Sequence, residues 1–226
     1  MLEAVIFDFD GVITDSEILH FRAFNVVLAP HGLELTKKEY YTKYLGLSDV
    51  DCLRALIDEG RLGIEKDQIQ DLISKKTRIY EKLAQTDGQL IEGVSEFLDM
   101  LRTAQIPIAI CSGSLRAEIE FVLRDAGLRD LFDVIVSAED VSRGKPDPEG
   151  FLLALQQLNE STVAPITPGK CIVIEDSHWG LEAARGAQMR TIAVTNTYDA
   201  GQLSAAHLVV ERLSDLTIDD LGKLCS

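Results

Sequence analysis

Short runs of consecutive apolar residues recur along the chain and predict buried β-strands. Each run has four to six residues, is rich in β-branched side chains and lacks a regular alternation with polar residues. Such runs are typical of parallel strands that are covered on both faces of a sheet. The five runs are AVIF (4–7), IPIAIC (106–111), FDVIV (132–136), CIVI (171–174) and TIAV (191–194).

Segments with helical spacing separate the later runs. The apolar residues between 115 and 126 fall on one stripe, and Gly127 follows them as a stop signal. Residues 178–187 form a shorter pattern that is rich in alanine. This alternation of strands and helices predicts an α/β fold, a doubly wound, Rossmann-like core around a parallel sheet.

Residues 14–90 interrupt the alternation and predict an inserted, all-helical cap domain. The segment has no clear strand pattern, and a structureless loop of this length is improbable inside a compact domain. Thr14 and Glu17 have the spacing of a helix capping box, and apolar residues follow at helical intervals. We therefore expect a core made of residues 1–13 and 91–226.

Composition narrows the classes of partner. The net charge of −15 argues against nucleic acid and against anionic lipid, and a small anionic partner would need a local cation. The four cysteines are far apart and form no C-x-x-C pair, which favours reduced thiols. The first residues lack the basic segment of a signal peptide, and no apolar run approaches the ~20 residues of a membrane helix. We expect a cytoplasmic protein and, by default, a monomer.

Candidate catalytic residues occur where the apolar runs end, which is the edge at which open parallel sheets form their sites. Asp8 and Asp10 follow the first run and share a face, and Gly11 lets the chain turn. Two carboxylates ~4 Å apart repel by about 4 kcal/mol at an effective dielectric constant of about 20, so they need a shared proton or a cation. The alternative is a turn in which the aspartates make only local hydrogen bonds.

Three further strand ends carry complementary groups. Ser112–Ser114 precede a predicted helix, whose N-terminus favours anions; Lys145 lies between a glycine and a proline-rich turn; and Glu175 and Asp176 end the fourth run. Each has an ordinary alternative, a helix cap or a solvated lysine. Together they supply the positioning and electrostatics that phosphoryl transfer needs, and hard oxygen ligands favour Mg²⁺.

At these residues the sequence resembles the haloacid dehalogenase superfamily of phosphotransferases, and most closely its β-phosphoglucomutase-like branch. The resemblance covers nearly the whole chain. It implies that Asp8 is the nucleophile that forms an aspartyl-phosphate and that Asp10 acts as acid and then as base. The matching motifs are DFDGVITDSE (8–17), Ser112, Lys145 in GKPDP and IEDSHWG (174–180).

The resemblance also implies binding roles. Mg²⁺ would be held by Asp8, the backbone carbonyl of Asp10 and Asp176, with Glu175 on the ion or beside it. Ser112 would hold the phosphoryl group, and Lys145 would neutralise charge on Asp8 and the phosphate. The candidates for binding substrate or phosphate are Gly11, Gly113, Ser114, His20, Gly46, Lys76 and Arg116.

Residues of the cap bear on the phosphate acceptor. His20 and Lys76 match cap residues of the mutase branch, although His20 could be an ordinary helix histidine and Lys76 could extend its stem along apolar surface to solvent. Asp49 stands where the mutase has an arginine that grips a second phosphate, and Arg116 could replace that cation or be solvated. The lost arginine favours a phosphatase for a small phosphate monoester, such as a sugar phosphate, over the alternative, a sugar phosphomutase.

Other classes explain the motifs less well. A dehalogenase would leave Asp10 and the Glu175–Asp176 pair without a role, and a phosphonatase would need a lysine near position 49. Signalling receivers are about half this length, and a dinucleotide fold would show G-x-G-x-x-G after the first strand. A catalytically silent phosphate-binding or signalling protein should have lost the nucleophile or a metal ligand, and neither is lost.

Overall fold

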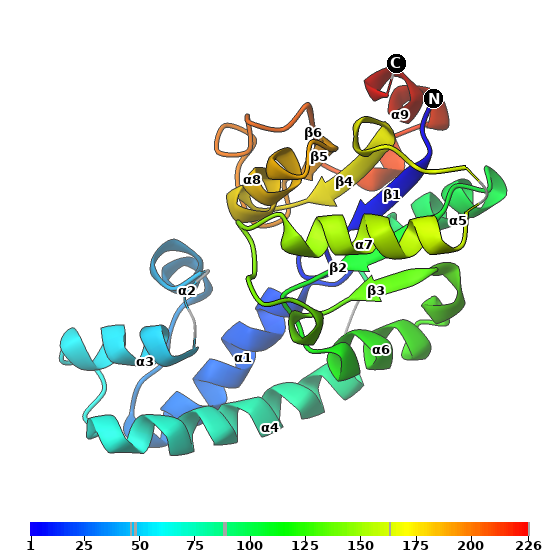
Figure 1. The fold of residues 1–226 in the computed structure, drawn as a ribbon. Helices are drawn as coiled ribbons and strands as arrows, with labels where there is room; N and C mark the ends of the chain where they lie inside the picture. Colours follow the sequence, from blue (N-terminus) through cyan, green and yellow to red (C-terminus); the bar gives the residue numbers. More distant parts are fainter. Residues whose placement is uncertain (46, 48, 88–89, 163, 226) are drawn as a thin grey trace. The chain divides into compact units, whose positions relative to one another are not determined.

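The computed structural model of the chain describes residues 1–226 except positions 46, 48, 88–89, 163 and 226 (Figure 1). It consists of two compact units, one formed by Met1–Asp15 with Gln89–Ser226 and the other by Ser16–Gly88. The division falls close to the boundaries expected from the sequence. The assignment of the units as catalytic core and cap stays a prediction.

The first unit is built on a six-stranded sheet in which every strand pair is parallel, which confirms the predicted fold class. The strand order β3-β2-β1-β4-β5-β6 reverses direction between β1 and β4, where doubly wound sheets place their ligands. The sequence did not predict β6, because its LVV run is short and only half buried. The strands are β1 (Ala4–Phe7), β2 (Ile108–Cys111), β3 (Val134–Val136), β4 (Cys171–Glu175), β5 (Arg190–Val194) and β6 (Leu208–Val210).

Helices cover both faces of this sheet, which explains why its strands are apolar throughout. Val5 and Phe7 pack into the cluster on one face, and Ala4 and Ile6 pack into the cluster on the other. Each fully buried large apolar side chain contributes about 1.5–3 kcal/mol. In Figure 1, α7 crosses in front of the sheet. The helices are α5 (Val94–Thr103), α6 (Arg116–Asp125), α7 (Glu149–Glu160), α8 (His178–Gly186) and α9 (Ile218–Leu224).

The strand register brings the polar strand ends to one level. Phe7 pairs with Ile110 of β2 and with Ile174 of β4. Asp8 continues the ladder, because its backbone N–H donates to the Ile174 carbonyl at 2.9 Å. The residues that follow these strands therefore lie side by side at the carboxyl edge of the sheet.

All regular elements among the described residues of the second unit are helices, and the unit has its own apolar core. Helix α1 begins at Ser16, one residue later than a Thr14 cap predicts, because Thr14 forms isolated bridges with Asp10 and Leu90 of the first unit. No helix in the described part of either unit combines the length and apolar character needed to span a bilayer. The α-helices are α1 (Ser16–Leu28), α2 (Lys37–Lys43), α3 (Asp49–Asp58) and α4 (Ile69–Asp87).

Candidate active site

Lys145 joins the ends of the two central strands. Its Nζ donates to Asp8 Oδ1 at 2.6 Å and to Glu175 Oε1 at 2.6 Å, and both acids are buried. Burial lowers the pKa of Lys145, but the Asp8 and Glu175 carboxylates outweigh it and hold that pKa well above its usual value. Lys145 is therefore an ammonium group fixed between two carboxylates, and it is not the solvated lysine of the ordinary alternative.

Glu175 has partners on both oxygens. While Oε1 accepts from Lys145, Oε2 accepts from the backbone N–H groups of Asp176 and Ser177, each at 3.0 Å, and from the Ser177 hydroxyl at 2.9 Å. A Cβ at Gly180 would lie 1.7 Å from Glu175 Oε1, so the helix approaches this carboxylate too closely for any side chain. Glu175 thus orders the turn from β4 into α8 and fixes Lys145.

Asp8, Glu175 and Asp176 form a buried acidic cluster whose candidate ligand oxygens all lie within 4.8 Å of one another. Burial raises the pKa of Asp8 well above its usual value, opposed by Lys145 and reinforced by the neighbouring acids. Burial and the Glu175 carboxylate raise the pKa of Asp176 to about 7. Lys145 offsets only part of this negative charge. The cluster therefore fits a hard divalent cation such as Mg²⁺, which prefers carboxylate oxygens.

Two serine hydroxyls from the turn after β2 contact Asp10, which follows β1. The Ser114 hydroxyl donates a short hydrogen bond to Asp10 Oδ2, and the Ser112 hydroxyl lies 3.4 Å from the same oxygen. The backbone N–H of Ser114 donates to Ser112 Oγ at 2.9 Å. The structure thus brings together the acid/base candidate and the phosphate-binding candidates that the sequence placed 102 and 104 positions away from it.

The Arg116 side chain is bound to β3 and to the turn after β3. Its Nη2 donates to Asp140 Oδ2 at 2.6 Å and to the backbone carbonyl of Ile135 at 2.8 Å. This guanidinium group ties the start of α6 to β3 and the turn that follows it. The structure does not support the expectation that Arg116 supplies a replacement cation.

A fifth strand end, which the sequence reasoning missed, contributes to the site. Thr197, just beyond β5, donates a short hydrogen bond from Oγ1 to Asp176 Oδ2, and Asn196 Nδ2 donates to the Gly11 carbonyl at 2.8 Å. Gly11 has φ +76°, and a Cβ there would lie 1.8 Å from Asp176 Oδ2. The sequence does contain an indication of this strand end, because polar residues follow the TIAV run just as they follow the other four apolar runs.

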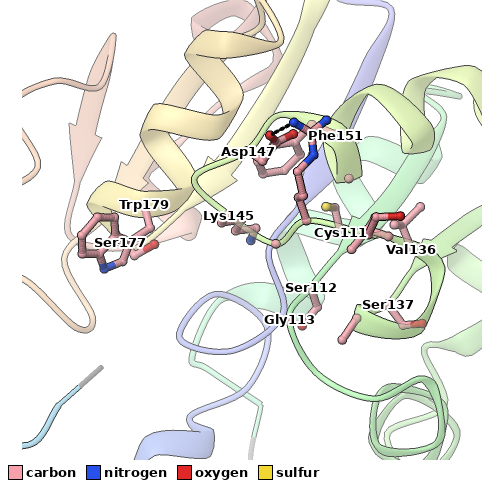
Figure 2. Close-up of a pocket in the computed structure, with 16 residues that line it drawn as sticks. Cys111, Ser112, Gly113, Val136, Ser137, Lys145, Asp147, Phe151, Ser177 and Trp179 are labelled. Atoms are coloured by element: carbon pink, nitrogen blue, oxygen red, sulfur yellow. Dashed lines mark ion pairs between the residues drawn. The ribbon is translucent and has the colours of Figure 1, made fainter. Parts of the chain in front are cut away.

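A cavity of about 470 Å³ lies within the first unit beside these groups (Figure 2). Ser112, Gly113 and Lys145 line it, together with the exposed Trp179. Figure 2 shows Lys145 between the Ser112–Gly113 turn and the side chains of Ser177 and Trp179. The volume is in the range of small-molecule sites.

The second unit contains its own charged cluster around Lys76. This lysine is buried, and its Nζ donates to Asp49 Oδ1 at 2.7 Å and contacts His20 Nδ1. It also lies 4.8 Å from the ring centroid of Phe24, and the His20 ring stacks on Tyr80 at 4.2 Å. The interpretation in which Lys76 extends its ammonium group to solvent is therefore wrong. Gly46, the other cap candidate, lies outside the described residues.

Comparison with known proteins identifies relatives with phosphate substrates. A family model described as haloacid dehalogenase-like hydrolase matches residues 2–188. The phosphorylated carbohydrates phosphatase of Thermotoga maritima is 33% identical, over 84% of each chain. The β-phosphoglucomutase of Bacillus subtilis is 32% identical, over 96% of this chain and 93% of that protein. A chloroplastic 5-amino-6-(5-phospho-D-ribitylamino)uracil phosphatase of Arabidopsis thaliana is 38% identical over 70% of this chain. The matched region is only 40% of that longer protein.

The structural comparison agrees with the sequence comparison. The crystal structure of CbbY from Rhodobacter sphaeroides in complex with phosphate superposes with a TM-score of 0.79 at 26% identity. The match covers 98% of this chain and 100% of that one, so it includes both units.

Proposed function

The chain belongs to the haloacid dehalogenase-like hydrolase family, and from this premise we propose that it is a Mg²⁺-dependent phosphatase of small phosphate monoesters. Asp8 forms an aspartyl-phosphate in this proposal, and the substrate is a sugar phosphate or a similar metabolite. The observation that carries it is the buried Asp8 carboxylate, 2.6 Å from the Lys145 ammonium and within the acidic cluster. The named activity of the Thermotoga relative supports the substrate class.

Asp8 is proposed as the nucleophile because its buried carboxylate lies beside the Lys145 ammonium group and within the acidic cluster that would hold the cation. The Asp8 oxygen attacks phosphorus, the bond from phosphorus to the ester oxygen breaks, and Asp10 gives its proton to the leaving oxygen. Water then attacks the phosphorus of the aspartyl-phosphate and gives a proton to Asp10, and the bond to Asp8 breaks. Lys145 offsets the negative charge that accumulates on Asp8 and on the phosphoryl oxygens.

Asp8, Asp176 and the backbone carbonyl of Asp10 are the groups that we propose would hold Mg²⁺. A bound Mg²⁺ would orient the phosphate and stabilise its charge. We assign Glu175 a place beside the ion, because its oxygens already accept from Lys145 and from the turn into α8. The Ser112 hydroxyl and the Gly113 N–H would donate hydrogen bonds to the phosphoryl oxygens, since both residues line the cavity next to Lys145.

The Lys76–Asp49 ion pair is our reason to favour water over a sugar hydroxyl as the acceptor. A mutase must hold a sugar bisphosphate while it reorients, and a free cation on the second unit would serve that purpose. Here the Asp49 carboxylate, 2.7 Å from Lys76, offsets the charge of that lysine. We further propose that the second unit is a cap whose closure excludes bulk water, and that His20 and Lys76 face the substrate.

A sugar phosphomutase is the second candidate, favoured by the similarity to the Bacillus β-phosphoglucomutase over almost the whole chain. Both activities are tested by measuring phosphate release from sugar phosphates, phosphoglycolate and nucleotides, with isomerisation of β-glucose 1-phosphate measured alongside. We expect Mg²⁺-dependent release that stops in EDTA. Formation of glucose 6-phosphate without inorganic phosphate would establish the mutase, and failure of every substrate with Mg²⁺ present would favour a catalytically silent protein.

A further inference from the structure

The hydrogen bond between Thr197 and Asp176 assigns a role to a residue outside the motifs that the sequence singled out. We propose that Thr197 is a positioning residue, whose hydroxyl fixes the orientation in which the Asp176 carboxylate meets a divalent cation. The inference rests on the proposed Mg²⁺-dependent function and adds a determinant of metal affinity to it.

The segment that carries Thr197 is tied to the sheet and to the turn after β1. Glu175 pairs with Ala193 in the register between β4 and β5, so the two strands end within one residue of each other. The Thr195 N–H donates to the Val210 carbonyl at 3.1 Å, and the Asn196 side chain donates to the Gly11 carbonyl at 2.8 Å. Hydrogen bonds to β6 and to the turn after β1 therefore anchor the two residues that precede Thr197.

The Asp176 carboxylate is packed between this segment and Gly11. A Cβ built on Gly11 would lie 1.8 Å from Asp176 Oδ2 and 2.9 Å from Thr197 Oγ1, so the three groups meet at one point. Asp176 is only 4% exposed, and its backbone N–H is bonded to Glu175. Oδ2 is thus held by the threonine, and the carboxylate retains its second oxygen for the cation.

Loss of the Thr197 hydroxyl should weaken Mg²⁺ binding more than it slows the reaction at saturating Mg²⁺. Mutation of a residue that is hydrogen-bonded to a metal ligand typically lowers metal affinity by about 10–100-fold. Without the donor, Asp176 would face the negative charges of Glu175 and Asp8 with one fewer restraint on its rotation. Thr197 touches neither the nucleophile nor the cavity beside Lys145 in the described contacts, so saturating Mg²⁺ should restore most of the turnover.

The test measures Mg²⁺ binding directly, by isothermal titration calorimetry on the metal-free full chain. Thr197→Val removes the donor with little change in volume, Thr197→Ser keeps a hydroxyl, and Thr195→Val is the matched control in the same turn. We expect Thr197→Val to weaken Mg²⁺ binding by about tenfold or more, and the serine variant and the control to stay within about threefold of the wild type. The Mg²⁺ concentration for half-maximal activity should rise in parallel, with kcat at saturation changed less.

Circular dichroism in EDTA shows whether each variant is folded before its affinity is compared. If Thr197→Val fails to fold, the comparison of Thr197→Ser with Thr197→Ala takes its place. Wild-type affinity in a folded Thr197→Val protein would overturn the inference, as would an equal loss in the serine variant. If the wild type binds Mg²⁺ and needs it for turnover while Thr197→Val is unchanged, only this inference fails. If the wild type binds no Mg²⁺, the proposed function fails as well.

Discussion

The ammonium group of Lys145 lies 2.6 Å from the carboxylate of Asp8, although 137 positions separate the two residues in the chain. The contact places the positive charge of Lys145 beside the proposed nucleophile, Asp8, inside a buried site. It also links stability to catalysis, because the same carboxylates that would bind a cation repel one another when none is bound.

Replacement of Asp8 by asparagine should abolish turnover without unfolding the protein. Asparagine has nearly the same shape, and its neutral amide relieves repulsion in the acidic cluster, but it cannot form the aspartyl-phosphate. We expect phosphate release to fall by at least about 10³-fold. The exposed Asp130→Asn variant is the matched control, and Asp8→Asn retaining most of the wild-type activity would show that the nucleophile is misassigned.

Replacement of Lys145 by methionine should lower both activity and stability. Methionine keeps the length of the side chain but leaves the Asp8 and Glu175 carboxylates buried without their cation, which costs about 3–5 kcal/mol when a buried pair loses one partner. Urea unfolding in EDTA measures the change in the free energy of unfolding. Lys170→Met is the control, because the Lys170–Glu3 pair lies at the surface and should contribute at most about 1 kcal/mol.

The acidic cluster should stabilise the metal-free protein increasingly as the pH falls from 8 to about 5.5. The pKa of Asp176 is raised to about 7 in the folded chain, above its ordinary value of 3.8, so the folded state binds more protons than the unfolded state across this window. The stability that this proton contributes is lost as the pH rises through 7, and the raised pKa of Asp8 acts in the same direction.

Urea unfolding in EDTA at pH 5.5 and pH 8 measures this dependence. Saturating Mg²⁺ should stabilise the protein more at pH 8, where the carboxylates are ionised, than at pH 5.5. Asp176→Asn should flatten the dependence observed in EDTA. An Asp176→Asn protein with the same pH dependence as the wild type would contradict the assignment of buried, proton-binding acids.

Removal of the Asp49 charge should shift selectivity toward substrates with two phosphates. Asp49→Asn keeps a hydrogen-bond acceptor for Lys76 but leaves its positive charge without a counterion. We expect the ratio of kcat/KM for a sugar bisphosphate to that for the monophosphate to rise, on the order of tenfold.

Asp51→Asn is the matched control for this change, because Asp51 lies on the same helix with its side chain 57% exposed. An unchanged ratio in folded Asp49→Asn would remove the main argument for preferring the phosphatase to the mutase.

Much of the fold was predictable from the sequence, because burial on both faces of a parallel sheet imposes a local pattern. AVIF, IAIC and CIVI were recognisable as strands because every residue in them is buried and therefore apolar. The run LVV (208–210) escaped prediction because an edge strand with half-buried residues lacks that pattern. The start of α1 was displaced by the bridges from Thr14 to Asp10 and to the distant Leu90, which no local pattern reveals.

The sequence by itself determined which chemical groups stand near the strand ends. Asp8 and Ser112 directly follow apolar runs, Asp176 comes two residues after one, and Lys145 lies between the third run and the next helix. Only the tertiary structure decided which of these groups meet, that Arg116 turns to Asp140, and that Thr197 holds Asp176. The physical reason is that apolar patterning reports burial one segment at a time. Hydrogen bonds and ion pairs between distant segments depend on the register in which those segments pack.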